Sequence, residues 1–540
     1  MNQLWRTRTS LVSILLFVCM SVLTSCGNNG GTQVSDSTSA NGNAHTHTFD
    51  EWKAVKEASC AEEGEQERTC SCGEKETRPI DATGHAWYVC FDQEGHYTRC
   101  TVCNEIGEKT VHTLSEDGFC SGCNQPLSAT DGLIYVKSAD GTYAEVVGYQ
   151  GSHKRVAIAD EYEGVPVREI APSAFLFKGM TDIYLPSSIT AIGERAFDEC
   201  SELEAVHISD IASWCRIDFA RTAKGDDSFT VLSNPLTYAT KLYINGTYSP
   251  KLVLTSDVTE VKPCAFWAYR GLIEVDCEEG LEKIGDNAFA HCPNLMLFHL
   301  PKSVKSVSPY AFYDSTKVWD FDSDNGVVYI DTCAYTYGPS AAVNLREGTT
   351  IIADEAMKAK EALKSITLPD SVRVIGKQAF LNCTSLIEVK GGNGVTVIDD
   401  EAFSQCYALS RITIPDGVTR IGDKAFWVCS ALTDVTIPGS VKSIGEQAFY
   451  NCGALANVTI CDGVTEITDS MFEYCNSLKN ITIPSSVTSI GEDAFRKCSA
   501  LTEIHFTGTK EQWNQISKGD GWSSNSAIVG IQCSDGYLNK

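Results

Sequence analysis

The sequence predicts a β-rich solenoid of about fifteen turns with a 23-residue period, preceded by small modules rich in cysteine and histidine. The dipeptide Ala-Phe recurs at intervals of about 23 residues, or near-multiples of 23, through the C-terminal two thirds of the chain. Half of the ten histidines and eight of the 24 cysteines lie between residues 45 and 127. With 540 residues, 43% of them hydrophobic, the chain is too apolar to be disordered and too long for one compact core.

The charge balance excludes one broad class of function. Seventy acidic residues against 43 basic residues give a formal net charge of -27. A general nucleic-acid binder carries a basic surface that neutralises phosphates, and this chain has the opposite balance. We therefore expect no nucleic-acid partner.

The N-terminus has the pattern of an export signal. A basic start precedes an apolar run at 11–23, which is shorter than the roughly 20 residues of a permanent membrane span. The Leu-Thr-Ser sequence ahead of Cys26 resembles the lipobox of bacterial lipoproteins, which implies removal of residues 1–25 and acylation of Cys26. An ordinary secretory signal cleaved nearby is the alternative. Residues 26–44 are polar and are predicted to form a flexible linker.

Two Cys/His-rich modules are expected next, at 45–88 and 89–127. The second resembles a zinc ribbon, because it contains two Cys-x-x-Cys pairs separated by sixteen residues, the spacing of two knuckles on one tetrahedral zinc ion. His96 and His112 lie close enough in sequence to replace a thiolate. The four predicted thiolate ligands are those of Cys100, Cys103, Cys120 and Cys123.

The first module contains a looser set of candidate ligands, Cys60, Cys70, Cys72 and His85, in which the Cys-x-Cys pair is one residue shorter than a standard knuckle. Disulfides are the competing interpretation for both modules, because exported proteins meet an oxidising compartment. The histidines favour zinc, since a disulfide framework does not use them. A closed site with four protein ligands is structural, so we expect structural zinc and no metal catalysis.

The repeat is defined by a buried aromatic anchor. Successive anchors are separated by 22, 69, 23, 23 and 45 residues and then six times by 23, so the register survives the irregular stretches. Met357 and Phe472 occupy the anchor position in two units whose dipeptide is Ala-Met or Met-Phe and not Ala-Phe. The dipeptide itself ends at Phe175, Phe197, Phe266, Phe289, Phe312, Phe380, Phe403, Phe426, Phe449 and Phe495.

The unit at 432–452 shows the expected structure of each turn. A β-branched strand ends at Pro438, and a second short extended piece ends at Gly445. The polar pair before Ala448-Phe449 predicts one helical turn that places Phe449 in the core. No unit can bury this face alone, so stacked units are expected to form a parallel sheet along a continuous core.

Ile-Pro, Val-x-x-Ile-Gly, Ala-Phe and Cys recur in fixed order, as in Ile437-Pro438 to Cys452, and resemble the BspA-like leucine-rich repeat over about residues 130–540. Residues 209–250 and 318–346 depart from the unit. The resemblance implies an N-terminal cap at 128–172, a leucine-rich-repeat solenoid at 173–498 and a C-terminal cap at 499–540.

A cysteine follows the anchor by three residues in eight turns. Stacked strands lie about 4.8 Å apart, so distance alone permits disulfides between neighbouring turns. Because this position is occupied by one cysteine per turn, we instead expect a ladder of buried free thiols that caps backbone groups. The eight are Cys200, Cys292, Cys383, Cys406, Cys429, Cys452, Cys475 and Cys498.

A row of outward-facing residues lies between the two apolar positions of successive strands. It comprises Thr367, Thr413, Thr436, Thr459, Thr482 and His505. One interpretation is that threonine simply has good strand propensity on a solvated face. The other is an extended surface that binds an extracellular protein or glycan.

The family resemblance implies a non-enzymatic protein of the cell surface, held to the membrane by its lipid, that serves adhesion or host interaction. An envelope-associated spacer without a ligand is the alternative. We find no nucleophile with a plausible base, no phosphate loop and no open metal site, so we expect no enzyme and no cofactor beyond structural zinc.

Overall fold

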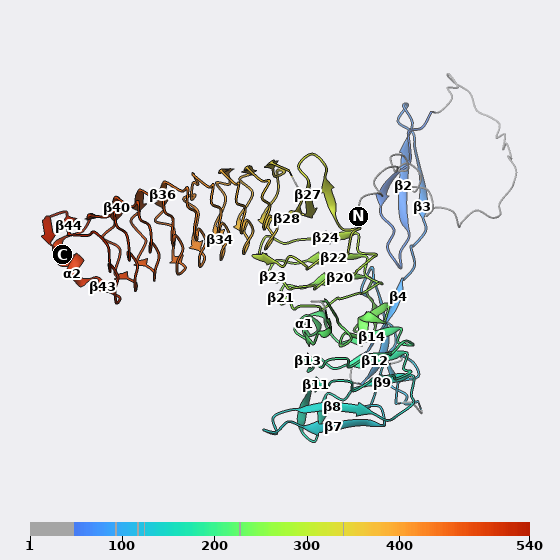
Figure 1. Ribbon diagram of the computed structural model, residues 1–540. Coiled ribbons are helices and arrows are strands. Elements are labelled where there is room, and N and C mark those ends of the chain that lie inside the picture. Colours follow the sequence, from blue (N-terminus) through green and yellow to red (C-terminus); the bar gives the residue numbers. More distant parts are fainter. Residues whose placement is uncertain are drawn as a thin grey trace, which may run out of the picture. The chain divides into compact units, whose positions relative to one another are not determined.

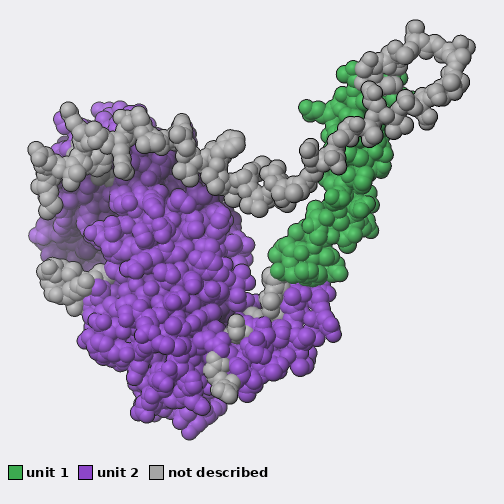
Figure 2. Space-filling view, turned by 90° about the vertical axis from the view of Figure 1, so that its right-hand side faces the viewer, with its two compact units in different colours: residues 1–87, 100–105 green, residues 88–99, 106–540 purple. Residues whose placement is uncertain are grey.

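The computed structural model divides the chain into two compact units (Figures 1 and 2). The N-terminal unit comprises residues 1–87 and 100–105, and the main unit comprises residues 88–99 and 106–540. Cys26, the predicted signal and the predicted linker lie outside the described residues. The structure describes residues 48–91, 94–115, 118–123, 125–225, 228–338 and 340–539.

The N-terminal unit contains an antiparallel sheet of β1 (Lys53–Lys56), β2 (Gly64–Thr69) and β3 (Lys75–Ile80). Most side chains of these strands are exposed or half-buried. Among the described residues of this unit, the only buried apolar side chains are those of Cys60, Cys70 and Cys100. The unit therefore has no hydrophobic core of the ordinary kind.

A second small sheet follows, with the strand order β4 (Trp87–Phe91), β5 (Gly95–Cys100) and β6 (Thr110–Val111). From β7 (Leu133–Lys137) onwards, the main unit is a β-solenoid of about 17 turns. This exceeds the fifteen turns counted from the Phe anchors, because β8 before the first anchor and β44 after the last also pair in parallel with the neighbouring turns.

The solenoid carries two columns of parallel strands (Figure 1). In the repeats of the C-terminal half, paired residues lie 23 positions apart, as in Asp434↔Asn457. The column of longer strands, here called the long-strand column, contains β9 (Arg155–Ala157), β12 (Asp182–Leu185), β14 (Ala205–Ile208), β18 (Lys241–Ile244), β20 (Lys251–Leu254), β22 (Glu274–Cys277), β24 (Leu297–His299), β29 (Ala342–Asn344), β31 (Ser365–Leu368), β33 (Glu388–Gly391), β36 (Asp434–Ile437), β38 (Asn457–Ile460), β40 (Asn480–Ile483), β42 (Glu503–Phe506) and β44 (Gly530–Cys533). The other column contains β8 (Ala144–Tyr149), β11 (Val165–Ile170), β13 (Ala191–Ile192), β15 (Asp218–Phe219), β21 (Glu260–Val261), β23 (Lys283–Ile284), β25 (Ser306–Val307), β28 (Cys333–Tyr337), β30 (Ile351–Ile352), β32 (Val374–Ile375), β34 (Val397–Ile398), β35 (Arg420–Ile421), β37 (Ser443–Ile444), β39 (Glu466–Ile467), β41 (Ser489–Ile490) and β43 (Ser517–Lys518).

The core is a stack of the predicted anchors. All eleven Phe anchors and Met357 are fully buried. Rings of neighbouring turns are nearly parallel, with centroids 5.0 Å apart for Phe380 and Phe403 and 5.4 Å apart for Phe403 and Phe426. This is the offset-stacked geometry that aromatic pairs favour. The stack confirms that the anchor sets the register.

The prediction of a helical turn at Ala448-Phe449 is wrong. Gln447 and Asn451, on either side of this dipeptide, have left-handed backbone with φ of 58° and 55°. Because these residues interrupt the right-handed helical geometry, their N–H groups point along the stack and donate to carbonyls of the next turn, at 3.0 Å for Gln447 and 2.8 Å for Asn451. The N–H of Phe449 donates in the same direction at 3.0 Å. The anchor segments thus form a third ladder between turns.

The predicted cysteine ladder caps backbone groups as expected. The thiol of each of the eight cysteines donates to the carbonyl of the anchor residue in the preceding turn, with sulfur-to-oxygen distances of 3.0–3.2 Å. Burial raises the pKa of the Cys383 thiol to about 11 and that of Cys452 to about 12. These residues are therefore thiols and not thiolates near neutral pH.

Several elements interrupt or close the array. Among the described residues, neither α-helix is long and apolar enough to cross a lipid bilayer. Trp513 of the C-terminal helix is buried and covers the last turns. The remaining elements are β10 (Glu161–Tyr162), α1 (Ile211–Cys215), β16 (Thr222–Gly225), β17 (Ser228–Thr230), the 3-10 helix η1 (Pro235–Thr237), β19 (Thr247–Tyr248), β26 (Asp320–Asp322), β27 (Val327–Ile330), α2 (Lys510–Gln515) and β45 (Gly536–Asn539).

Candidate metal centres and binding face

Cysteine and histidine side chains converge at two separate places. In each, one ligand atom from each of four residues lies within 4.8 Å of the others. The first Cys/His cluster lies in the N-terminal unit and consists of Cys60, His85, Cys100 and Cys103. The second Cys/His cluster lies in the main unit and consists of His96, His112, Cys120 and Cys123.

The first cluster gathers loops around the end of β5. Cys60 comes from the β1–β2 loop, and its Sγ lies 3.7 Å from that of Cys100, the last residue of β5. Cys103 follows in the next turn, with its Sγ 3.3 Å from Nδ1 of His85. The other ring nitrogen of His85 lies 3.3 Å from a carboxylate oxygen of Glu105. A carboxylate in this position orients a ligating imidazole.

The second cluster is built from β5, the end of β6 and a later turn. His96 lies on β5, and its Nδ1 is 3.7 Å from Sγ of Cys120. His112 directly follows β6, and its Nδ1 is 3.5 Å from Sγ of Cys123. Cys120 is fully buried, and Cys123 is half-buried.

Both clusters contain a turn in which backbone N–H groups point at sulfur. The N–H of Val102 donates to Sγ of Cys100, and the N–H of Gly122 donates to Sγ of Cys120, each at 3.4 Å. The backbone N–H of Cys103 is the main cause that lowers the pKa of Cys100 to about 6. Burial raises the pKa of Cys120, but hydrogen bonds from its neighbours outweigh this effect and bring it to about 5. Both turns therefore favour the thiolate at their first cysteine, whereas burial raises the pKa of Cys60 and of Cys123.

The structure does not bring the four predicted thiolates together. It places Cys100 and Cys103 in the first cluster, and Cys120 and Cys123 in the second. Of the additional candidates, Cys60, His85, His96 and His112 each join a cluster. Cys70 and Cys72 belong to neither of the two clusters found among the described residues. A Cys-x-x-Cys pair fixes only local geometry, so its spacing does not determine which distant residues complete the site.

The predicted binding face is partly one surface. Thr436, Thr459, Thr482 and His505 lie directly opposite one another in β36, β38, β40 and β42, with their side chains exposed or half-buried. Thr367 holds the same position in a different sheet, where it lies opposite Asn344 and Lys390. Thr413 is exposed and lies outside the named strands.

The same position is aromatic near the start of the solenoid, which the sequence prediction missed. Tyr184, His207 and Tyr243 lie opposite one another in β12, β14 and β18. The ring centroids of Tyr184 and His207 are 3.9 Å apart, and those of His207 and Tyr243 are 4.6 Å apart. The signal was present, since each residue stands between two apolar strand residues, as Thr436 does. We call these three residues the aromatic row.

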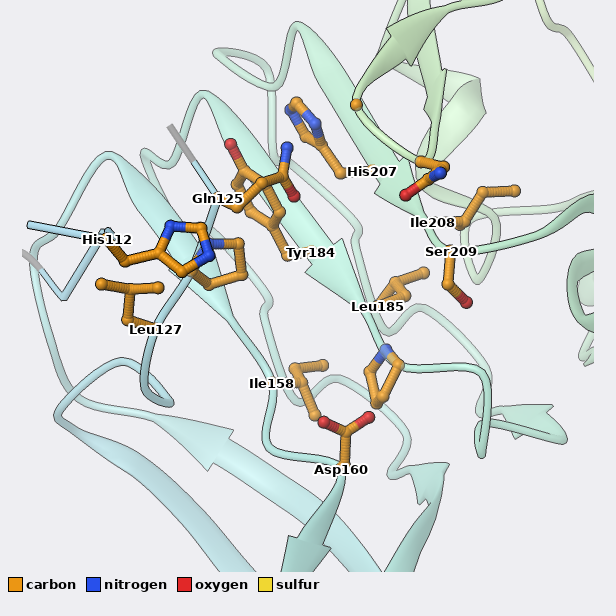
Figure 3. A pocket seen from close by; sticks show the side chains of 14 residues that line it. His112, Gln125, Leu127, Ile158, Asp160, Tyr184, Leu185, His207, Ile208 and Ser209 are labelled. Atoms are coloured by element: carbon orange, nitrogen blue, oxygen red, sulfur yellow. The ribbon is translucent and has the colours of Figure 1, made fainter. Parts of the chain in front are cut away.

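A hollow of about 600 Å³ lies over Tyr184 and His207 of the aromatic row, as Figure 3 shows. Its floor includes Tyr184 and His207, and one wall comes from the segment that contains His112 and Gln125. Nε2 of His207 lies 3.0 Å from a carboxylate oxygen of Asp182, whereas its Nδ1 has no hydrogen-bond partner among the described residues. Further polar lining comes from Asp160, Ser209 and Asn245.

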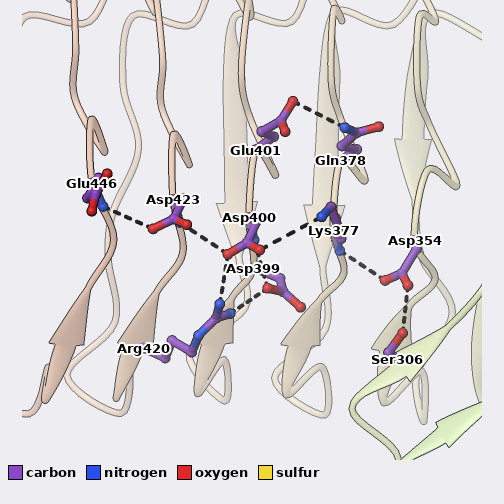
Figure 4. A network of polar contacts seen from close by, with 10 residues as sticks. All are labelled: Ser306, Asp354, Lys377, Gln378, Asp399, Asp400, Glu401, Arg420, Asp423 and Glu446. Carbon is purple, nitrogen blue, oxygen red and sulfur yellow. Dashed lines mark hydrogen bonds and ion pairs between the residues drawn. The ribbon is translucent and has the colours of Figure 1, made fainter.

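An acidic network joins successive turns of the other column (Figure 4). Arg420 forms ion pairs with Asp399 and Asp400, the latter at 2.7 Å. Oδ1 of Asp400 accepts a hydrogen bond from the backbone N–H of Asp423 at 3.1 Å. Burial raises the pKa of Asp354 to about 6, against hydrogen bonds from Ser306 and the N–H of Lys377. These contacts join neighbouring turns and have a structural role.

The repeat, the stacked anchors and the parallel columns define a leucine-rich-repeat solenoid. The family description "BspA type Leucine rich repeat region (6 copies)" matches more than half of the chain, and the chain belongs to this family. The matched residues are 167–218, 240–362, 350–479 and 419–519.

Several proteins of known structure are similar to this chain. A leucine-rich repeat protein of Treponema pallidum is 29% identical over 38% of this chain and 94% of its own, with a TM-score of 0.31. A leucine-rich cell surface protein of Faecalibacterium prausnitzii is 22% identical over 72% of this chain and 97% of its own, with a TM-score of 0.27. The pneumococcal vaccine antigen PcpA is 17% identical over 74% of this chain and 98% of its own, with a TM-score of 0.31. No curated protein matches the chain.

Proposed function

We propose that this chain is an exported, non-enzymatic surface protein whose solenoid binds an extracellular protein or glycan, in adhesion or host interaction. The observation that carries the proposal is the hollow over the aromatic row, on the outward face of the long-strand column. Repeat solenoids use such extended faces for binding.

The aromatic end of this face is the better candidate for the primary site. Tyrosine and histidine rings supply flat apolar area, and the polar groups of Asp160, Ser209 and Asn245 supply hydrogen bonds at the rim. The row from Thr436 to His505 offers mainly small threonine side chains on the strand face. We assign it a supporting role in contact with an extended ligand.

Export and anchoring are part of the same proposal. The apolar run at 11–23 and the lipobox-like sequence before Cys26 support a lipoprotein held at the outer face of the membrane. The Faecalibacterium protein described above is also a cell surface protein. Mass spectrometry of the membrane-extracted protein tests the anchor, since cleavage before Cys26 removes residues 1–25 and acylation of Cys26 adds the mass of the acyl chains.

Binding of the chain to immobilised glycans and matrix proteins tests the function. Replacement of Tyr184 and His207 by Ala is expected to weaken binding at least about 10-fold, because both rings line the hollow and each truncation removes ring area from its floor. The matched variant Thr436→Ala/Thr459→Ala alters the same strand position away from the hollow and is expected to change affinity less than about threefold. A chain that binds no member of the panel would favour the spacer alternative, and equal losses in both variants would contradict the assignment to the aromatic row.

A further inference from the structure

We infer that the two Cys/His clusters are two independent structural zinc sites, one with three thiolates and one imidazole and the other with two thiolates and two imidazoles. The first would use Cys60, His85, Cys100 and Cys103. The second would use His96, His112, Cys120 and Cys123.

The distances between ligand atoms match a tetrahedron around zinc. With Zn–S bonds of about 2.3 Å, two thiolates of a tetrahedral site lie about 3.8 Å apart, and a thiolate and an imidazole nitrogen lie about 3.6 Å apart. The two sulfurs of Cys60 and Cys100 are 3.7 Å apart. The three sulfur-to-nitrogen distances are 3.3 Å in the first cluster and 3.7 and 3.5 Å in the second.

The donor chemistry selects the metal. Thiolate and imidazole ligands suit zinc, whereas calcium and magnesium require oxygen ligands. Four protein donors fill a tetrahedral site and leave no position for a substrate. The alternative of disulfides fits poorly, because Sγ of Cys60 and Cys100 are 3.7 Å apart, against about 2.05 Å in a disulfide, and the first cluster has an odd number of thiols.

The N-terminal unit needs such a site. Its sheet buries almost nothing, and the buried apolar side chains among its described residues are cysteines, two of which are in the first cluster. Small domains that lack a hydrophobic core are commonly stabilised by a structural metal. Zinc between Cys60 and Cys103 would connect the β1–β2 loop to the turn after β5.

The second site has a consequence for the binding face. His112 both belongs to the second cluster and lines the hollow over the aromatic row. Phe119, next to Cys120, is fully buried and packs on Tyr184 with ring centroids 4.9 Å apart. Zinc at this site would therefore hold one wall of the hollow in place. This consequence depends on the proposed function, whereas the zinc sites themselves do not.

The zinc content of the full chain, purified under reducing conditions without chelator, tests the inference. We expect two zinc ions per chain and one in each of the variants Cys100→Ser/Cys103→Ser and Cys120→Ser/Cys123→Ser. The control Cys70→Ser/Cys72→Ser, which alters cysteines outside both clusters, is expected to keep two. If the two Cys-x-x-Cys pairs shared one zinc, each pair variant would lose all metal, which would overturn the inference.

Cobalt substitution provides a second readout that reports ligand type. Thiolate-to-cobalt charge-transfer absorption grows with the number of thiolates, so loss of the first site should leave about two fifths of the signal and loss of the second about three fifths. The zinc retained at the unaltered site shows that each variant is folded there. Fewer than two zinc ions in the unaltered chain, or a mass two daltons low for each bridge formed among cluster cysteines, would contradict the inference.

Discussion

The cysteines of the two Cys/His clusters and those of the solenoid ladder are the same residue in opposite environments. In the clusters, N–H groups and imidazoles point at sulfur, and the pKa of Cys100 falls to about 6. In the ladder, the thiol donates to an anchor carbonyl, and burial raises the pKa of Cys452 to about 12. Whether the sulfur accepts or donates a hydrogen bond thus separates Cys100 and Cys120 from the packing cysteines of the ladder.

The contrast extends to how each region is held together. The N-terminal unit has mostly exposed strands, and its convergent side chains are the cysteines and the histidine of the first cluster. The solenoid instead repeats one apolar anchor and three hydrogen-bonded ladders in turn after turn. The stability of the N-terminal unit therefore depends on a few individual contacts. The stability of the solenoid is distributed over many equivalent contacts between neighbouring turns.

Thiol labelling gives the largest expected difference between the two regions. After zinc is removed by a chelator, Cys100 and Cys120 should react with a thiol reagent at least roughly 10³-fold faster than the ladder cysteines, because the reactive species is the thiolate. Peptide mass spectrometry of the labelled chain measures both classes. Denaturant should make the ladder cysteines react rapidly, and fewer than six slowly reacting ladder thiols in the folded chain would contradict the ladder.

Removal of one anchor tests the solenoid alone. Phe426→Ala deletes a fully buried ring from the stack and is expected to lower the free energy of unfolding of the surrounding turns by about 3–5 kcal/mol. Hydrogen exchange measured by mass spectrometry locates the loss. The exposed control Thr436→Ala should change stability by less than about 0.5 kcal/mol. Loss of bound zinc from Phe426→Ala would show that the two regions are not independent.

Acid should act on the two regions in opposite directions. The pKa of Asp354 is raised from 3.8 to about 6 in the folded chain, so between these pH values the folded chain holds a proton that the unfolded chain has released. Its contribution to stability is therefore complete below pH 4 and declines as pH rises through 6, by up to about 3 kcal/mol. At the proposed zinc sites, in contrast, protonation of the thiolates at low pH would release the metal and lower stability.

The difference in unfolding free energy between the unaltered chain and Asp354→Asn, measured by urea titration at pH 4, 5, 6 and 7, isolates this carboxyl. The unaltered chain should lose stability relative to the variant as pH increases. If the difference in unfolding free energy does not change with pH, the Asp354 carboxyl has the same pKa in the folded and the unfolded chain.

The parts of the structure that the sequence predicts are those with a repeating signal. One Phe anchor per turn fixes both register and core, so the solenoid follows from spacing alone. The turn around Ala448-Phe449 was misassigned because a helical turn and a turn with left-handed residues at Gln447 and Asn451 bury the same side chains. The pattern of polar and apolar residues is the same for both kinds of turn, so it does not show which backbone hydrogen bonds form.

The candidate sites follow less directly from sequence. The Cys-x-x-Cys pairs locate the ligating turns, but β5 carries His96 near its start and Cys100 at its end, so one strand serves two clusters. Four extended residues separate these positions by about 13 Å, too far for one metal site. The aromatic row was hidden by the irregular anchor spacings of 22 and 69 residues, which obscure the alignment of Tyr184 with Tyr243.

The direction of the three ladders has a mechanical consequence. Their hydrogen bonds run from one turn to the next, along the solenoid, so a pull on the C-terminal end separates the last turn first, because that turn is paired on one side only. Each turn that peels away frees 23 residues, or roughly 75 Å of extended chain, in place of about 5 Å of stacked height. A protein anchored at one end and loaded at the other would thereby lengthen in steps and limit the tension on its attachment.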